Sequence, residues 1–125
     1  MKAEIQRSQL VIIDMQDKLA GAMPKEVVNK IIQRCELIAT LAKIEEIPVV
    51  VTEQYPQGLG KTLSSMIPFL THASFIEKTA FSCVDDPKFN AKLIETRDQI
   101  ILAGMEAHIC ILQTALDLID QGKKV

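Results

Sequence analysis

The sequence predicts a three-layer αβα fold, of the α/β class, with a mainly parallel sheet. Short apolar runs that suit buried strands alternate along the chain with longer segments whose apolar residues recur at helical spacing. Several of these runs are followed by a charged or reactive side chain, and parallel strands would gather such side chains at one edge of a sheet. Strands that alternate with helices form parallel sheets through right-handed crossovers. We therefore expect helices to cover both faces of the sheet.

The first strand and the first long helix follow from the N-terminal third of the chain. The run Gln9 to Ile13 suits a strand that is buried on both faces, and Asp14 stands at its C-terminal end. Pro24 can occupy a first helical turn. Apolar residues then recur at helical spacing from Val28 to Ile44, which predicts a long helix.

Two further strands are expected in the middle of the chain. Pro48 to Thr52 has the β-branched density of a second parallel strand. The stretch after it, Tyr55 to Gly60, contains proline and glycine, so we expect a loop at the carboxyl edge of the sheet. A weaker extended segment covers Ser74 to Glu77.

The C-terminal third repeats the alternation. Pro87 to Ile94 can form a short helix, and Gln99 to Ala103 is a strong strand. The last helix is expected to run from about Cys110 to Asp120 and to stop at Gly122. Because no repeat, linker or low-complexity segment interrupts this order, residues 1–125 are expected to form a single domain.

Composition excludes several classes of protein. The 125 residues carry a formal net charge of −2, and the 14 basic and 16 acidic residues are interspersed, so no basic patch predicts a nucleic-acid or membrane partner. The N-terminal apolar run is too short for a signal peptide or a membrane span. The three cysteines lack the spacing of a disulfide framework or a zinc site. We expect a cytoplasmic protein with reduced thiols.

Cys110 is the first candidate for a reactive group. It stands where the strand Gln99 to Ala103 should turn into a helix, and a helix N-terminus favours thiolate over thiol and can hold an oxyanion. Asp14 and Lys78 should reach the same edge, where a carboxylate can accept the thiol proton and an ammonium can stabilise the thiolate. Each residue also has an ordinary interpretation: Cys110 as core packing, Asp14 as a helix cap and Lys78 as a solvated lysine.

Four segments of the chain resemble the isochorismatase-like cysteine hydrolases. They are VIIDMQDKL at 11–19, VTEQYPQGLG at 51–60, EKTAFSC at 77–83 and GMEAHICILQTALDL at 104–118. The resemblance is ordered and spans nearly the whole chain. It is closer to the isochorismatase domain-containing branch than to the related nicotinamidases.

The resemblance implies a catalytic triad and a mechanism. It makes Asp14 the general base, Lys78 the cation, and Cys110 the nucleophile that attacks a carbonyl or imidate-like carbon to form a thioester, which water then hydrolyses. It also implies a non-proline cis peptide between Met105 and Glu106, which would turn the Glu106 N–H towards the oxyanion that the Cys110 N–H also faces. By position, the expected pocket walls and substrate contacts are Leu19, Gln54, Tyr55 and Phe81.

The chain departs from the nicotinamidases in the loop after the second strand. Those enzymes place metal-binding aspartate and histidines there, whereas this chain reads TEQYP from Thr52 to Pro56. The only two histidines, His72 and His108, have no paired spacing, so we expect no metal, and no cofactor is implied. Family members that hydrolyse isochorismate can lack the cysteine. Cys110 therefore favours acyl chemistry on a small amide, imide or related acyl compound.

The resemblance stops at Lys123 to Val125, where a family member would begin a fifth strand. The family's Rossmann-type strand order, 3-2-1-4-5-6, would leave the strand Gln99 to Ala103 with an open edge of unpaired backbone groups. The chain thus looks truncated after the fourth strand and its helix. We expect it either to belong to a longer polypeptide or to associate with a neighbouring chain as a homo-oligomer.

Three functions remain open at this point. The triad favours a cysteine hydrolase that acts on a small molecule. The alternative is a catalytically idle family member that serves as an oligomeric binding or scaffold protein. A flavodoxin-like nucleotide binder ranks third, because neither GxGxxG nor GxxxxGKS follows the first strand.

Overall fold

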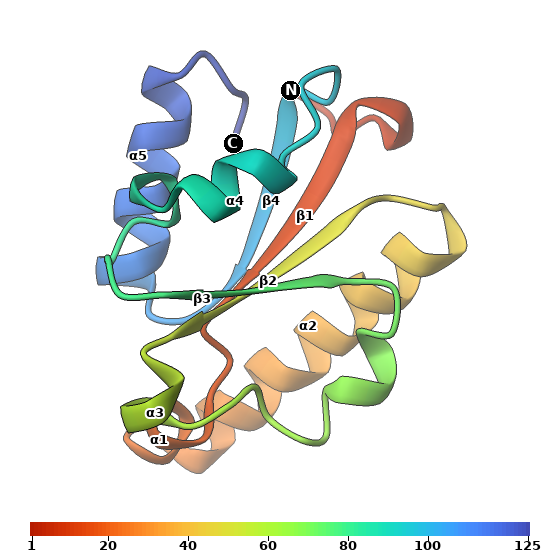
Figure 1. Cartoon of the computed structure of the whole chain (residues 1–125). Helices are drawn as coiled ribbons and strands as arrows, with labels where there is room; N and C mark the ends of the chain where they lie inside the picture. Colours follow the sequence, from red (N-terminus) through yellow and green to blue (C-terminus); the bar gives the residue numbers. More distant parts are fainter.

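A parallel sheet of four strands lies between two layers of helices in the computed structural model, which describes residues 1–125 (Figure 1). The strands are β1 (Ser8–Ile13), β2 (Val49–Gln54), β3 (Ser74–Lys78) and β4 (Gln99–Gly104). Their order across the sheet is β3-β2-β1-β4, and every neighbouring pair is parallel. The predicted three-layer α/β fold is confirmed.

β1 is a central strand and contributes to the core on both faces of the sheet. Leu10 and Ile12 belong to one apolar cluster, while Val11 and Ile13 belong to a second. Successive side chains of a strand point to opposite faces, so one short run of apolar residues builds two cores. All six residues of β1 are buried, as expected for a strand that is covered on both faces.

The two helical layers follow from these clusters. The long helix α2 (Lys25–Ile44) packs on one face of the sheet, and the short α4 (Pro87–Lys92) and α5 (Leu112–Asp120) pack on the other (Figure 1). Asp86 caps α4, because its side chain accepts a hydrogen bond from the Lys88 N–H. None of the helices combines the length and the apolar composition that crossing a membrane demands.

Short helices occupy segments for which the sequence predicts none. α1 (Asp17–Gly21) follows β1, and α3 (Pro56–Leu59) lies inside the stretch expected to be a loop. With five and four residues, these helices are too short for a recurring apolar stripe to appear in the sequence. The additional 3-10 turns are η1 (Ile5–Arg7), η2 (Ile67–Phe69) and η3 (Cys83–Asp85).

The last helical segment begins differently from the expectation. A π-helical turn, η4 (Ala107–Ile111), comes first, and the regular helix α5 begins only at Leu112. Cys110 therefore lies inside the π turn and not at the first residue of an α-helix. Single π turns of this kind are rare and occur often at functional sites.

β4 forms one edge of the sheet, and the last residues pair with the start of that edge. Lys124 and Gln99 form a parallel bridge. The Ile100 N–H donates to the Lys124 carbonyl at 2.7 Å, and the Lys124 N–H donates to the Asp98 carbonyl at 2.9 Å. The edge expected to be open is thus paired at its beginning.

Candidate active site

Three of the residues singled out in the sequence meet at the carboxyl ends of the strands. Asp14 follows β1, Lys78 is the last residue of β3, and Cys110 lies in η4 after β4. The Lys78 Nζ is 3.1 Å from Asp14 Oδ2 and 3.8 Å from Cys110 Sγ. The parallel topology brings these residues together across 96 positions of sequence, from 14 to 110.

Asp14 is held from the neighbouring strand. Its backbone N–H donates to the Thr52 carbonyl at 3.1 Å, and the Thr52 hydroxyl donates to Asp14 Oδ1 at 2.8 Å. Asp14 adopts a left-handed conformation, with φ of 53°, and is fully buried. The carboxylate therefore has one oxygen fixed by Thr52 and the other facing Lys78.

Lys78 is a buried cation, which excludes its interpretation as a solvated lysine. Its side chain has no exposed surface. Besides Asp14 Oδ2, the ammonium donates to Gln54 Oε1 at 2.6 Å and to the carbonyls of Ala80 and Phe81 at 3.0 and 3.1 Å. An ammonium carries three N–H donors, so these four oxygens satisfy it completely.

Cys110 is held as a neutral thiol in this environment. Burial raises the pKa of the Cys110 thiol to about 12; the Asp14 carboxylate also raises it, and the Lys78 ammonium lowers it. The expectation that a helix N-terminus would favour the thiolate is wrong for this resting state, because desolvation and a nearby carboxylate outweigh the cation. A group that accepts the thiol proton is needed before the sulfur can act as a nucleophile.

The peptide bond between Met105 and Glu106 is cis, at the position that the family resemblance implied. Met105 is buried, and the Glu106 N–H has no hydrogen-bond partner within the chain. Just before it, Gly104 ends β4 with φ of 124°, where a side chain would collide with the Ile13 carbonyl. The chain therefore passes very close to β1 as it leaves the sheet.

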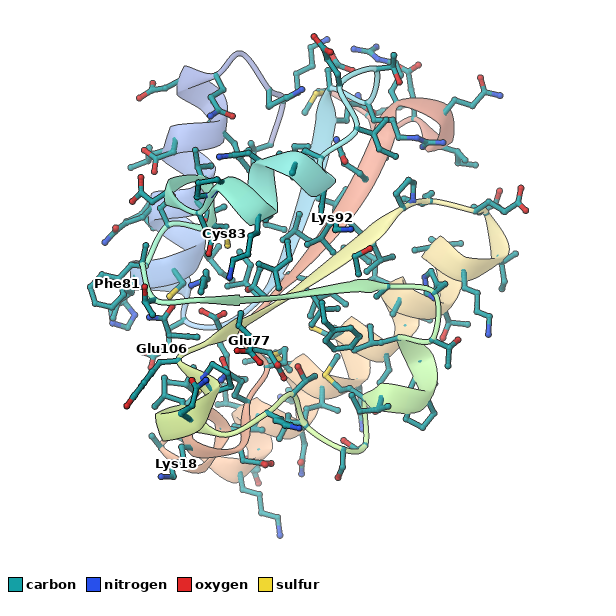
Figure 2. The ribbon with its side chains drawn as sticks, viewed as in Figure 1. Lys18, Glu77, Phe81, Cys83, Lys92 and Glu106 are labelled. Atoms are coloured by element: carbon teal, nitrogen blue, oxygen red, sulfur yellow. The ribbon has the colours of Figure 1, made fainter.

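A small pocket of about 90 Å³ opens beside Cys110. Leu19, Gln54 and Phe81 line it, as expected for three of the four predicted contacts. Figure 2 shows Phe81 and Glu106 at the same end of the sheet. The complete lining is Leu19, Gln54, Leu59, Phe81, Glu106, Ile109 and Cys110.

The structure does not bring Tyr55 into this pocket. Its ring packs over Gly58, and the residue lines a separate, more polar hollow together with Asp86 and Lys88. Tyr55 has a left-handed backbone, with φ of 36°, at the start of α3. Position in the loop at the carboxyl edge of the sheet predicts Tyr55 as a pocket wall, but the sequence does not reveal this left-handed turn.

Sequence reasoning missed several residues at this site. Leu59 and Ile109 reach the pocket from α3 and η4, the two elements that the sequence did not predict. Thr52 was missed because its role depends on the strand register, in which it stands opposite Ile13. Cys83 contacts Thr52, with its Sγ 4.0 Å from the Thr52 Oγ1. Burial raises the pKa of the Cys83 thiol.

The segment in which nicotinamidases hold a metal has a different arrangement here. Glu53 is buried, and its Oε2 accepts hydrogen bonds from both the backbone and the hydroxyl of Thr62. No three histidine, cysteine, aspartate or glutamate side chains gather closely enough to hold a metal ion. His108 is exposed and lies 3.6 Å from the Glu106 carboxylate, while His72 is remote from the site and has both ring nitrogens buried without partners.

The isochorismatase domain family matches residues 8–125. Isochorismatase domain-containing protein 1 of Danio rerio is 43% identical over 115 residues, which cover 90% of this chain and 39% of that protein. Isochorismatase domain-containing protein 2 of Homo sapiens is 37% identical over 123 residues, which cover 94% of this chain and 56% of that protein.

A solved structure of a relative gives the same result for the fold. The MAR1 ribonuclease from Caenorhabditis elegans superposes with a TM-score of 0.89 at 34% identity, covering 98% of this chain and 62% of the other. The chain thus spans about 39% to 56% of the length of the two curated relatives.

Proposed function

The chain belongs to the isochorismatase domain family, and on that premise we propose that it is a cysteine hydrolase of small amides, imides or related acyl compounds. The observation that supports this proposal most directly is Lys78, buried between Asp14 and Cys110. A lysine with no exposed surface is rarely retained for packing, because burying its charge costs roughly several kcal/mol unless the partners compensate. Here the partners are a base and a thiol, which favours a catalytic interpretation.

In the proposed reaction, Asp14 accepts the proton of the Cys110 thiol as the sulfur attacks the substrate carbonyl carbon. The protonated Asp14 then donates that proton to the leaving nitrogen, the C–N bond breaks, and an acyl thioester remains on Cys110. A water molecule attacks the thioester with Asp14 again as base. The acid is released and the thiol recovers its proton.

Two groups would stabilise the charge that develops during these steps. The Lys78 ammonium, 3.8 Å from the sulfur, favours the thiolate as it forms and lowers the pKa of Cys110. The unpartnered Glu106 N–H, next to the pocket, is a candidate donor to the oxyanion, together with the Cys110 N–H. A single donor of this kind typically contributes about 3 kcal/mol to lowering the barrier.

The name of the solved relative raises ribonuclease activity as a second possibility. The pocket beside Cys110 is lined mostly by apolar side chains, and its one charged lining residue is Glu106. A phosphodiester is an anion that needs cationic groups or a metal at the point of reaction. The arrangement of this site therefore favours acyl chemistry over cleavage of RNA.

Alkylation of Cys110 at increasing pH tests the triad. Asp14→Asn should lower the Cys110 pKa, because the carboxylate that raises it is removed, and Lys78→Met should raise it further. Cys35, which is buried in α2 away from the site, serves as the internal control and should not respond. A Cys110 that titrates near about 8.5 and ignores both substitutions would show that the triad is misassigned.

A substrate screen separates the hydrolase from an idle scaffold. Small amides and imides are incubated with the protein, and intact mass detects an acyl adduct that should be absent in Cys110→Ala. Hydrolysis of any substrate found should fall by roughly three orders of magnitude or more in that variant. An unreactive panel, combined with alkylation that is insensitive to Asp14 and Lys78, would favour the idle scaffold.

A further inference from the structure

We propose that the pocket beside Cys110 selects uncharged substrates with a small apolar body and excludes carboxylates. The inference rests on the proposed function, because it describes which molecules reach the Cys110 sulfur. It concerns the charge of the substrate, which the proposed reaction alone leaves open.

The lining of the pocket is the first observation. Leu19, Leu59, Phe81 and Ile109 present apolar side chains from four different segments around the sulfur. The volume of about 90 Å³ accommodates a group of only a few heavy atoms. A small aliphatic group attached to a carboxamide matches both the size and the polarity of this space.

The second observation is that no cation is free to bind a carboxylate. Lys78 is the nearest, yet four oxygens already surround its ammonium at 2.6 to 3.1 Å and its side chain has no exposed surface. A substrate carboxylate could recruit it only by displacing one of these oxygens. The lining contains no arginine, lysine or histidine.

The third observation is the sign of the charges around the sulfur. Asp14 and Lys78 form a neutral pair, so Glu106 leaves the site with one net negative charge at neutral pH. His108 can offset that charge only when protonated, and it is 74% exposed and 3.6 Å from the Glu106 carboxylate. An incoming carboxylate would meet like charge in a partly desolvated site, which is unfavourable.

The same charges would assist release of the product. Hydrolysis of an amide yields a carboxylic acid that ionises at neutral pH. A pocket that holds the neutral amide but repels the anion would bind substrate more tightly than product. Inhibition by the product acid is therefore expected to be weak.

Two alkylating reagents of nearly the same size, one neutral and one anionic, test the proposal. Iodoacetamide and iodoacetate are reacted with the full chain at pH about 9, and the adduct at Cys110 is quantified by peptide mass spectrometry. The ratio of the two rates is divided by the same ratio for free cysteine. We expect Cys110 to prefer iodoacetamide by at least tenfold after this correction.

Substitution of Glu106 makes the test specific. Glu106→Gln should bring the corrected preference at Cys110 several-fold closer to one. Glu77→Gln removes the same charge from an exposed residue that does not line this pocket, and should leave the preference unchanged. As a second measurement, isobutyramide should protect wild-type Cys110 from iodoacetamide at concentrations at which isobutyrate does not.

The outcomes are distinguishable. A corrected preference near one, or equal protection by the amide and the acid, overturns the proposed selectivity and leaves the hydrolase proposal intact. If neither reagent modifies Cys110 in the folded chain, although both modify it after unfolding in urea, the thiol is not accessible from the pocket, and both the selectivity and the proposed function are wrong. A preference that survives Glu106→Gln unchanged overturns the proposed repulsion between Glu106 and the incoming carboxylate.

Discussion

Lys78 Nζ and Asp14 Oδ2 lie 3.1 Å apart, and neither side chain has any exposed surface. A pair buried to this degree has lost all of its hydration, so each charge depends on the other and on the surrounding hydrogen bonds. Thr52 supplies such a bond to Asp14, and Gln54 supplies one to Lys78. Thr52 and Gln54 of β2 thus hold the ion pair between Asp14, which follows β1, and Lys78, the last residue of β3.

The first prediction concerns the stability of this pair. Asp14→Asn or Lys78→Met alone leaves the opposite charge buried without its partner, which should lower the free energy of unfolding by about 3–5 kcal/mol. The double substitution removes both charges and should cost clearly less than the sum. Urea unfolding followed by circular dichroism measures the three values. Additive losses would mean that the two charges are not coupled.

The second prediction concerns Thr52. Thr52→Val keeps the shape but removes the hydroxyl that donates to Asp14 Oδ1, and should lower the free energy of unfolding by about 1.5–3 kcal/mol, as for a hydrogen bond to a charged group. It should also slow hydrolysis, because Asp14 is no longer held in place. Thr52→Ser keeps a hydroxyl and should recover most of both losses.

A matched control for Thr52 is available in α2. The Thr40 hydroxyl donates to the Glu36 carbonyl on the exposed side of that helix. Thr40→Val should change stability by less than about 0.5 kcal/mol and leave hydrolysis unaffected. If Thr52→Val behaves like Thr40→Val in both measurements, Thr52 does not position Asp14.

The sequence was sufficient for the parts of this site that depend on position along a strand. Asp14 follows a long apolar run and Lys78 follows an extended segment, so a parallel sheet places both at one edge. Thr52 could not be assigned in this way, because its contact depends on the register of β1 against β2. The family resemblance, and not periodicity, suggested that Lys78 is more than a surface residue.

The residues that line the pocket could not be predicted from the positions of the strands, for a different physical reason. Leu59 and Ile109 reach the pocket from a four-residue helix and a π-helical turn, whose geometry no apolar period reveals. Tyr55 lies outside this pocket for the same reason, because the left-handed turn at its own position cannot be read from the sequence. Helices longer than about two turns could be predicted from the sequence, although their predicted ends differ from the observed ends by a few residues.

The third prediction concerns the approach of β4 to β1. Gly104 has φ of 124°, and a Cβ built there would collide with the Ile13 carbonyl oxygen. Gly104→Ala should therefore force the end of β4 away from β1 and destabilise the protein by at least about 1–3 kcal/mol. Because η4 begins just after this point, the rate of Cys110 alkylation should change as well.

Gly122→Ala separates the clash with Ile13 from the backbone strain that any side chain at a positive φ would cause. Gly122 also has a positive φ, of 82°, but no atom lies within 4 Å of the Cβ position. Gly122→Ala should therefore lower the free energy of unfolding only through the strain of a left-handed backbone, by about 1–2 kcal/mol. The reactivity of Cys110 should not change. Equal effects of the two substitutions, in stability and in alkylation, would contradict the proposed clash with Ile13.

The fourth prediction concerns stability at alkaline pH. Burial raises the pKa of Cys110 to about 12 and that of Cys35 to about 11, above the value of about 8.5 expected for an unfolded chain. Above that value the unfolded chain loses thiol protons that the folded chain keeps. The free energy of unfolding should therefore be constant with respect to these groups below about pH 8.5 and fall as pH rises towards 11.

Substitution of the cysteines assigns this pH dependence to individual thiols. Cys110→Ala should make the decrease between about pH 8.5 and 10.5 less steep, and Cys35→Ala should do so independently, because the two cysteines belong to separate core clusters on opposite faces of the sheet. The measurement is urea unfolding under reducing conditions at several pH values. If the slope in Cys110→Ala equals that of the wild type, the buried thiol of Cys110 ionises as readily in the folded protein as in the unfolded chain, and about half of it would have lost its proton at about pH 8.5 without any help from Asp14.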